Sequence, residues 1–109
     1  MSVTPKSPNG HRDEKYFLIF LTSIPGRSLP AEIVGRHAAH LAQLDSEGKL
    51  VLAGPIPERL GGLIVLRTRS LDEARAIAEE DPLVRGQFQT YEVGTWLMSD
   101  RDNNYRPNI

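Results

Sequence analysis

The pattern of hydrophobic and polar positions predicts four strands and two helices in the order β-α-β-β-α-β. Residues 15–23 and 63–68 are short runs that are apolar on both alternating faces, which is typical of central strands. Residues 49–56 and 87–97 form the two further strands. The first of these carries a proline and precedes another, and it is expected at a sheet edge because proline donates no ladder hydrogen bond.

Residues 28–47 show the 3.6-residue periodicity of a helix, with Ser28 as the expected N-cap and Gly48 as the left-handed stop. Pro30 then falls in the first turn, where its missing N–H is tolerated. The second helix follows a capping box at residues 70–73 and ends at Asp81, because a residue before proline disfavours the α region. Two helices over a four-stranded antiparallel sheet give a ferredoxin-like α+β sandwich.

The two predicted helices cover only one face of this sheet. The other face would expose the tyrosine, phenylalanine, leucine and isoleucine side chains of the central strands, which is more apolar surface than a monomer normally leaves open. A second copy that packs sheet against sheet would cover it. We therefore expect a homodimer formed through the open sheet face.

The chain of 109 residues suits one domain. Residues 1–14 are polar and predict a flexible tail, residues 15–98 carry the folded pattern, and residues 99–109 form a polar extension without regular structure. The longest apolar run is too short to span a bilayer, and no secretory signal precedes it, so we expect a cytoplasmic protein without membrane contact.

Composition excludes several classes of function. The net charge of −1 argues against non-specific binding to nucleic acid, which needs a basic surface. The chain has no cysteine, which removes disulfides, thiolate metal sites and cysteine nucleophiles. No phosphate-binding glycine loop or nucleotide-fold spacing is present. We expect no cofactor.

The first helix has an unusual apolar stripe. At ~100° per residue, His37 and His40 fall on the same face as Ile33 and Leu44. Imidazole groups buried without partners are unfavourable, so both are either hydrogen-bonded core residues or the lining of a polar cavity. Histidines at this spacing can share a metal ion, but the sequence offers no convincing third ligand, and we expect no metal.

Asp81 closes an acidic run at the end of the second helix, where the helix dipole disfavours negative charge. It is either part of a solvated acidic end, or it turns back toward the sheet and pairs with a histidine. In the second case the carboxylate would orient the imidazole and select its tautomer. A histidine–aspartate pair in a small cavity is a minimal device for general acid–base catalysis.

Other residues fit a ligand site around this pair. Gly54 and Pro55 follow the second strand and are expected to shape the cavity wall. Arg36 and Arg85 would hold an anionic ligand or, as is more usual for arginine, remain solvated.

The chain resembles the YCII-related domain family over residues 15–98. The residues that carry the resemblance follow the spacing H-x3-L-x2-L-x3-G-x-L-x2-A-G-P and are completed by an Asp-Pro after the second helix: His37, Leu41, Leu44, Gly48, Leu50, Ala53, Gly54, Pro55, Asp81 and Pro82. The resemblance implies a dimeric α/β barrel and a pocket in which His37 and Asp81 form a catalytic pair, with His40 one turn further along. Arg85 departs from the family pattern, where a small residue is usual.

Some relatives in this family act in the degradation of aromatic compounds, including a dehydrochlorinase, and the fold is shared with muconolactone isomerases. The resemblance therefore implies a cofactor-independent lyase or isomerase in which His37 moves a proton on a small anionic or cyclic substrate and Asp81 orients it. Five residues are expected to bind the substrate: Arg36, His40, Gly54, Pro55 and Arg85. The alternatives are a non-catalytic ligand-binding or accessory module, and a structural dimer with vestigial histidines.

Overall fold

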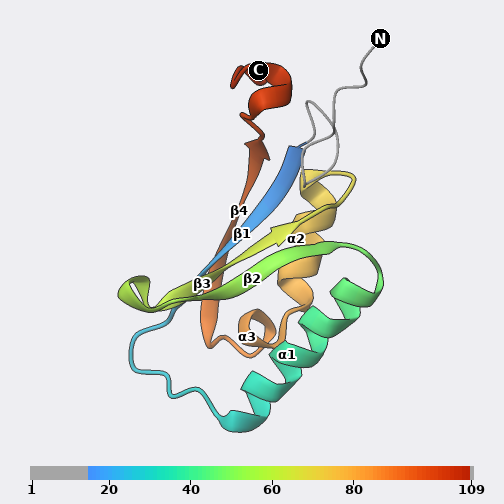
Figure 1. The fold of residues 1–109 in the computed structure, drawn as a ribbon. Coiled ribbons are helices and arrows are strands. Elements are labelled where there is room, and N and C mark those ends of the chain that lie inside the picture. The colour runs from blue at the N-terminus through green and yellow to red at the C-terminus, as the bar shows by residue number, and fades with distance from the viewer. Residues whose placement is uncertain (1–14, 109) are drawn as a thin grey trace.

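The computed structural model describes residues 15–108, so the predicted N-terminal tail lies outside the described residues. The chain forms β1 (Lys15–Ser23), α1 (Ala31–Ser46), β2 (Leu50–Ile56), β3 (Gly61–Leu66), α2 (Leu71–Glu80), α3 (Pro82–Arg85) and β4 (Gln89–Leu97), with the 3-10 helices η1 (Pro57–Arg59) and η2 (Arg101–Asn103) (Figure 1). The predicted β-α-β-β-α-β order is confirmed. The short helix α3 and the two 3-10 helices are additions to it.

The four strands form one antiparallel sheet in the order β2-β3-β1-β4. β1 and β3 are central and β2 is an edge strand, as predicted. The core lies between α1, α2 and one face of the sheet, where Phe17, Ile19 and Ile64 pack with Leu44 and Ile77 of the helices. This is the predicted four-stranded α+β sandwich.

The start of α1 differs from the prediction. Ser28 is not the N-cap, because Pro30 occupies that position with an extended ψ of 147°, and no side chain in the described part of the chain caps the helix. The end of α1 is as predicted. Gly48 has φ +74°, and Lys49 N donates to Leu44 O at 2.9 Å. These features are those of a Schellman motif.

The capping box at the start of α2 is half formed. The Ser70 side chain accepts a hydrogen bond from Glu73 N, as predicted. The Glu73 carboxylate accepts from Arg69 N at 2.8 Å instead of closing the box on Ser70. The prediction that the C-terminal extension has no regular structure was wrong, since Asp100 and Asn103 form a full capping box around η2.

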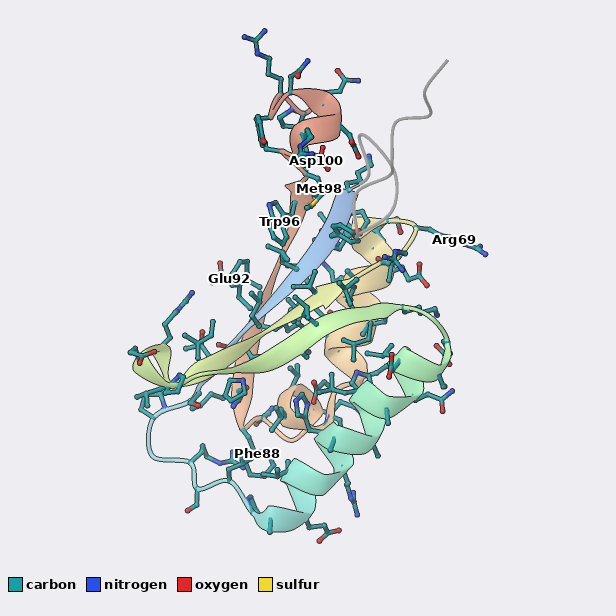
Figure 2. All side chains as sticks on the ribbon, viewed as in Figure 1. Arg69, Phe88, Glu92, Trp96, Met98 and Asp100 are labelled. Carbon is teal, nitrogen blue, oxygen red and sulfur yellow. The ribbon has the colours of Figure 1, made fainter. Side chains whose placement is uncertain are left out.

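The face of the sheet opposite the helices carries uncovered apolar side chains. Leu52 is 67% exposed and Trp96 is 44% exposed. Figure 2 shows Trp96 and Glu92 on the side of β4 that faces away from α2. Tyr16 was also expected to be open on this face, but it is buried, and the Arg67 guanidinium lies over its ring. Among residues 15–108, no helix combines the length and the apolar character needed to cross a bilayer.

Gly61 joins η1 to the central strand β3 and tolerates no side chain. A Cβ atom there would overlap the backbone oxygen of Leu21 on the neighbouring strand. We expect Gly61→Ala to lower the free energy of unfolding by at least about 2 kcal/mol, because relief of the overlap must move backbone. Gly35→Ala is the matched control. A Cβ there meets no atom of residues 15–108 within 4 Å, and alanine should stabilise the exposed helix by about 1 kcal/mol.

Urea unfolding of both alanine variants measures the difference. Similar changes in stability for Gly61→Ala and Gly35→Ala would contradict the close approach of β1 and β3 at this point.

Candidate active site

Asp81 is held at the corner between two helices. α2 ends at Glu80, Asp81 adopts an extended conformation, and α3 begins at Pro82. The Asp81 carboxylate caps α3, since its Oδ1 accepts a hydrogen bond from Leu83 N at 2.9 Å. An aspartate N-cap followed by proline is a favourable helix start. The side chain is thereby fixed in the interior, where Asp81 is only 1% exposed.

His37 meets this carboxylate from α1. Its Nδ1 lies 2.8 Å from Asp81 Oδ2 and 3.0 Å from Oδ1. A carboxylate can only accept, so Nδ1 carries the proton of this bond. Nε2 is therefore the basic nitrogen of the neutral ring. The His37 side chain is 20% exposed, so the pair is buried at the aspartate and open at the imidazole.

The imidazole forms part of the wall of a cavity of about 410 Å³. The cavity lies between α1, α3 and residues of all four strands, and most of its lining is aliphatic. Of the residues that the structure describes, His37 and Gln89 supply its polar side chains. The other lining residues are Leu21, Leu29, Val34, Ala38, Leu41, Ala53, Gly54, Pro55, Gly61, Gly62, Leu63, Ile64 and Leu83. A small organic molecule of largely apolar surface fits such a space.

The structure brings some of the expected binding residues to this cavity and leaves others outside it. Gly54 and Pro55 lie in its wall. Arg36 does not, because its guanidinium points outward and pairs with Glu32 at 2.6 Å. Arg85 is exposed at the end of α3 and is not part of the lining.

His40 also lies outside the cavity lining, one turn along α1 from His37. Its Nε2 is buried and has no hydrogen-bond partner among residues 15–108. The sequence pattern correctly placed the ring on the inward stripe, but it gave no information on what faces each position. The residues described contain no group of three or more histidine, aspartate or glutamate side chains arranged to hold a metal ion.

Gln89 was missed from the sequence. It is the first residue of β4 and shares the helix-covered face with Tyr91 and Val93, which pack against the core. The period-two pattern of the strand could have placed it there, since residues 89, 91 and 93 alternate with outward-facing positions. A polar residue at the end of a predicted strand did not, by itself, indicate a cavity.

A second cleft lies where α1, β3 and α2 meet, and it is lined by charged side chains. Lys49 Nζ there lies 3.2 Å from Glu73 and 3.3 Å from Glu47. Both hydrogen bonds raise the pKa of Lys49, and the bond to Glu73 has the larger effect. The pKa of Glu73 is lowered, first by the hydrogen bond from Arg69 N. Lys49 is thus paired with acidic neighbours. Because the His37–Asp81 pair lies at the other cavity, we place the candidate active site there.

The chain belongs to the YCII-related domain family, whose family model matches residues 16–97. This confirms the resemblance inferred from the sequence. The chain is 34% identical over 67 residues to the uncharacterized protein YjpA of Bacillus subtilis (strain 168). That match covers 62% of this chain and 79% of YjpA.

Among solved structures, the chain is similar to 5-chloro-2-hydroxyhydroquinone dehydrochlorinase (TftG) from Burkholderia phenoliruptrix AC1100, in complex with 2,5-dihydroxybenzoquinone. The TM-score is 0.55 at 24% identity, and the match covers 74% of this chain and 92% of the other. At this identity the likeness is one of fold.

Proposed function

We propose that this protein is a small-molecule enzyme of lyase or isomerase type, in which His37 acts as a general acid–base and Asp81 orients it. The observation that carries the proposal is the double contact of His37 Nδ1 with the buried Asp81 carboxylate, at 2.8 and 3.0 Å, beside an apolar cavity. An imidazole held in one tautomer is ready to accept a proton at its other nitrogen.

The proposed chemistry needs only this pair. His37 Nε2 takes a proton from a carbon next to an electron-withdrawing group, and the imidazolium that forms is stabilised by the Asp81 carboxylate. In an elimination, the electron pair left on carbon forms a double bond and expels a leaving group from the adjacent carbon. In an isomerisation, the same proton returns to a different carbon of the substrate. The aliphatic wall keeps water from competing for the proton.

The structural neighbour supports this class of reaction. That neighbour is a dehydrochlorinase, and its structure holds 2,5-dihydroxybenzoquinone, a small ring compound. Removal of hydrogen chloride is an elimination and requires a base. We carry over to this chain only the reaction type, as part of the proposal.

A panel of small rings that can undergo elimination or isomerisation tests the proposal, with 5-chloro-2-hydroxyhydroquinone as the first compound. The expected result is product formation that requires His37. The second candidate function, a binding module, is favoured by the scarcity of polar groups in the cavity, and it predicts thermal stabilisation by a ligand without any product.

We also propose that the protein is a homodimer joined through the open sheet face, which would complete a dimeric α/β barrel. The support is the uncovered apolar surface that includes Leu52 and Trp96. A charge buried within such an interface should prevent association, since it would lose its solvation without a partner.

Leu52→Glu is therefore expected to convert a dimer into a folded monomer in sedimentation velocity. Ala76→Glu, at an exposed position of α2, is the control and should leave the dimer intact. A monomeric wild-type protein, or a Leu52→Glu variant that stays dimeric, would contradict this interface.

A further inference from the structure

Among residues 15–108, no charged side chain lines the cavity beside His37. Both arginines expected to attract an anion lie outside it, and Arg36 is paired with Glu32. The walls are formed largely by leucine, alanine, glycine and proline. A charged ligand that entered would lose its hydration, and these walls would return very little of that free energy.

The His37–Asp81 pair offers no surplus positive charge. When the imidazole is neutral, the buried Asp81 carboxylate leaves the pair with a net charge of −1. When the imidazole is protonated, the carboxylate at 2.8 Å already neutralises it. An anionic ligand is therefore repelled when the imidazole is neutral. When the imidazole is protonated, the ligand must share its positive charge with the Asp81 carboxylate.

Gln89 adds an unused hydrogen-bond acceptor. Its Oε1 is buried and has no hydrogen-bond partner among residues 15–108, and its Nε2 donates one long bond of 3.5 Å to Ser23 Oγ. An unpaired buried carbonyl is unfavourable, so the site is poised to accept a donor. The terminal torsion of glutamine is broad, and rotation about it can turn the oxygen toward the cavity that Gln89 lines.

We propose that this cavity selects an uncharged small organic ring that carries a hydroxyl group. Gln89 is the specificity residue, because its Oε1 accepts a hydrogen bond from that hydroxyl group. This inference rests on the proposed function, because the ligand it describes is the compound on which His37 acts. It replaces the expectation of an anionic substrate. Gln89 Oε1 and His37 Nε2 would fix two points of the ligand, while the aliphatic lining takes the rest of its surface. A cavity of about 410 Å³ lies toward the small end of the range for ligand pockets, ~300–1,000 Å³.

Four probes of nearly equal size separate charge from hydrogen bonding: toluene, benzyl alcohol, benzoate and benzylammonium. Their dissociation constants are measured by ligand-observed NMR with the full chain at neutral pH. We expect benzyl alcohol to bind at least about fivefold more tightly than toluene, since it satisfies the buried acceptor. Benzoate should bind more weakly than benzyl alcohol by at least about tenfold, because no unpaired cation receives it. Benzylammonium should also bind more weakly than benzyl alcohol, because the hydration that its charge loses in the aliphatic cavity outweighs its attraction to the His37–Asp81 pair.

Gln89→Leu removes the acceptor at similar side-chain volume and is expected to abolish the preference for benzyl alcohol over toluene. Ser23→Ala is the matched control, because it removes the partner of the Gln89 amide nitrogen and leaves the oxygen in place. It should retain the preference. A purely structural role for Gln89 would alter the binding of both probes together and leave their ratio unchanged.

Tighter binding of benzoate than of benzyl alcohol would overturn the proposal, and so would the absence of binding by all four probes. A Gln89→Leu variant that retains the wild-type ratio would overturn the role of Gln89. These outcomes are distinguishable from failure of the proposed function. If the predicted order of affinities is found and no ring compound is turned over, the ligand class stands and the catalytic role of His37 fails.

Discussion

Replacement of His37 by glutamine is expected to lower the turnover of a ring substrate by about two to four orders of magnitude, the contribution that a positioned general acid–base typically makes. Glutamine is polar and of comparable length, but it cannot accept and return a proton near neutral pH. The cavity and the Asp81 cap of α3 should persist, because neither depends on the basicity of the imidazole. The measurement is kcat/KM with any compound that the wild-type protein converts.

The control for this experiment is Arg75→Gln, which removes a partly exposed side chain of α2 that pairs with Asp72. It should leave kcat/KM unchanged. Asp81→Asn should lower kcat/KM in the same direction as His37→Gln, since an amide in place of the carboxylate no longer stabilises the imidazolium. A His37→Gln variant that retains more than half of the wild-type rate would exclude His37 as the base.

Replacement of Asp81 by alanine is expected to lower the free energy of unfolding by about 2–4 kcal/mol. The loss combines the N-cap of α3, which is the hydrogen bond from Leu83 N and is worth about 0.5–2 kcal/mol, with about 1–3 kcal/mol for leaving His37 Nδ1–H without its acceptor. Relief of the cost of burying a carboxylate offsets part of this loss. Urea unfolding at neutral pH measures it.

Two further variants serve as comparisons for Asp81→Ala: one retains an N-cap side chain, and the other removes an exposed aspartate. Asp81→Asn should be less destabilising than Asp81→Ala, because asparagine is also a favourable N-cap. Asp72→Ala removes an aspartate whose side chain is 93% exposed and should change stability by no more than about 0.5 kcal/mol. Equal effects of Asp81→Ala and Asp72→Ala would contradict the position of Asp81 in the interior.

The arrangement of the sheet could be predicted because burial on two faces leaves a direct mark on the sequence. β1 and β3 are apolar at successive positions, and only central strands of a sandwich need that pattern. The boundaries were less predictable. The third strand was predicted at residues 63–68, yet Gly61 and Gly62 are both paired in β3, and at Gly61 the close approach of the neighbouring backbone excludes a side chain.

The start of α1 shows a limit of local signals. Ser28 has the chemistry of an N-cap, but the extended conformation of Pro30 delays the helix until Ala31. A serine two residues before the cap position cannot satisfy the first helical N–H groups. In the same way, the Asp-Pro pair correctly predicted the end of α2. The further turn of helix that follows was not predicted, although an aspartate followed by proline also favours a helix start.

The contact between His37 and Asp81 was predictable in part. Helical spacing placed His37 on the inward stripe, and Pro82 forced Asp81 out of α2, so both side chains could turn toward the interior. Their catalytic role stays a prediction. The outward position of Arg36 had a signal that was not used, because Glu32 lies four residues earlier on the same helix and pairs with it.

The contents of the cavity could not be predicted from spacing, because they depend on which strands and helices surround it. Gln89 comes from the far end of the fold, and only the register of β4 against β1 brings it beside Ser23. Periodicity identifies which face a residue occupies. It does not identify the residues that meet across that face.

The central claim is that His37 moves a proton on a ligand held in the cavity, with Asp81 to orient it. The most direct measurement is the incorporation of solvent deuterium into a bound ring compound, followed by NMR at saturating ligand for the wild-type protein and His37→Gln. We predict incorporation or conversion with the wild-type protein and none with the variant, although both bind the ligand. The claim would be contradicted if a ligand saturated the wild-type protein and was recovered chemically unchanged, with no carbon-bound proton exchanged for deuterium.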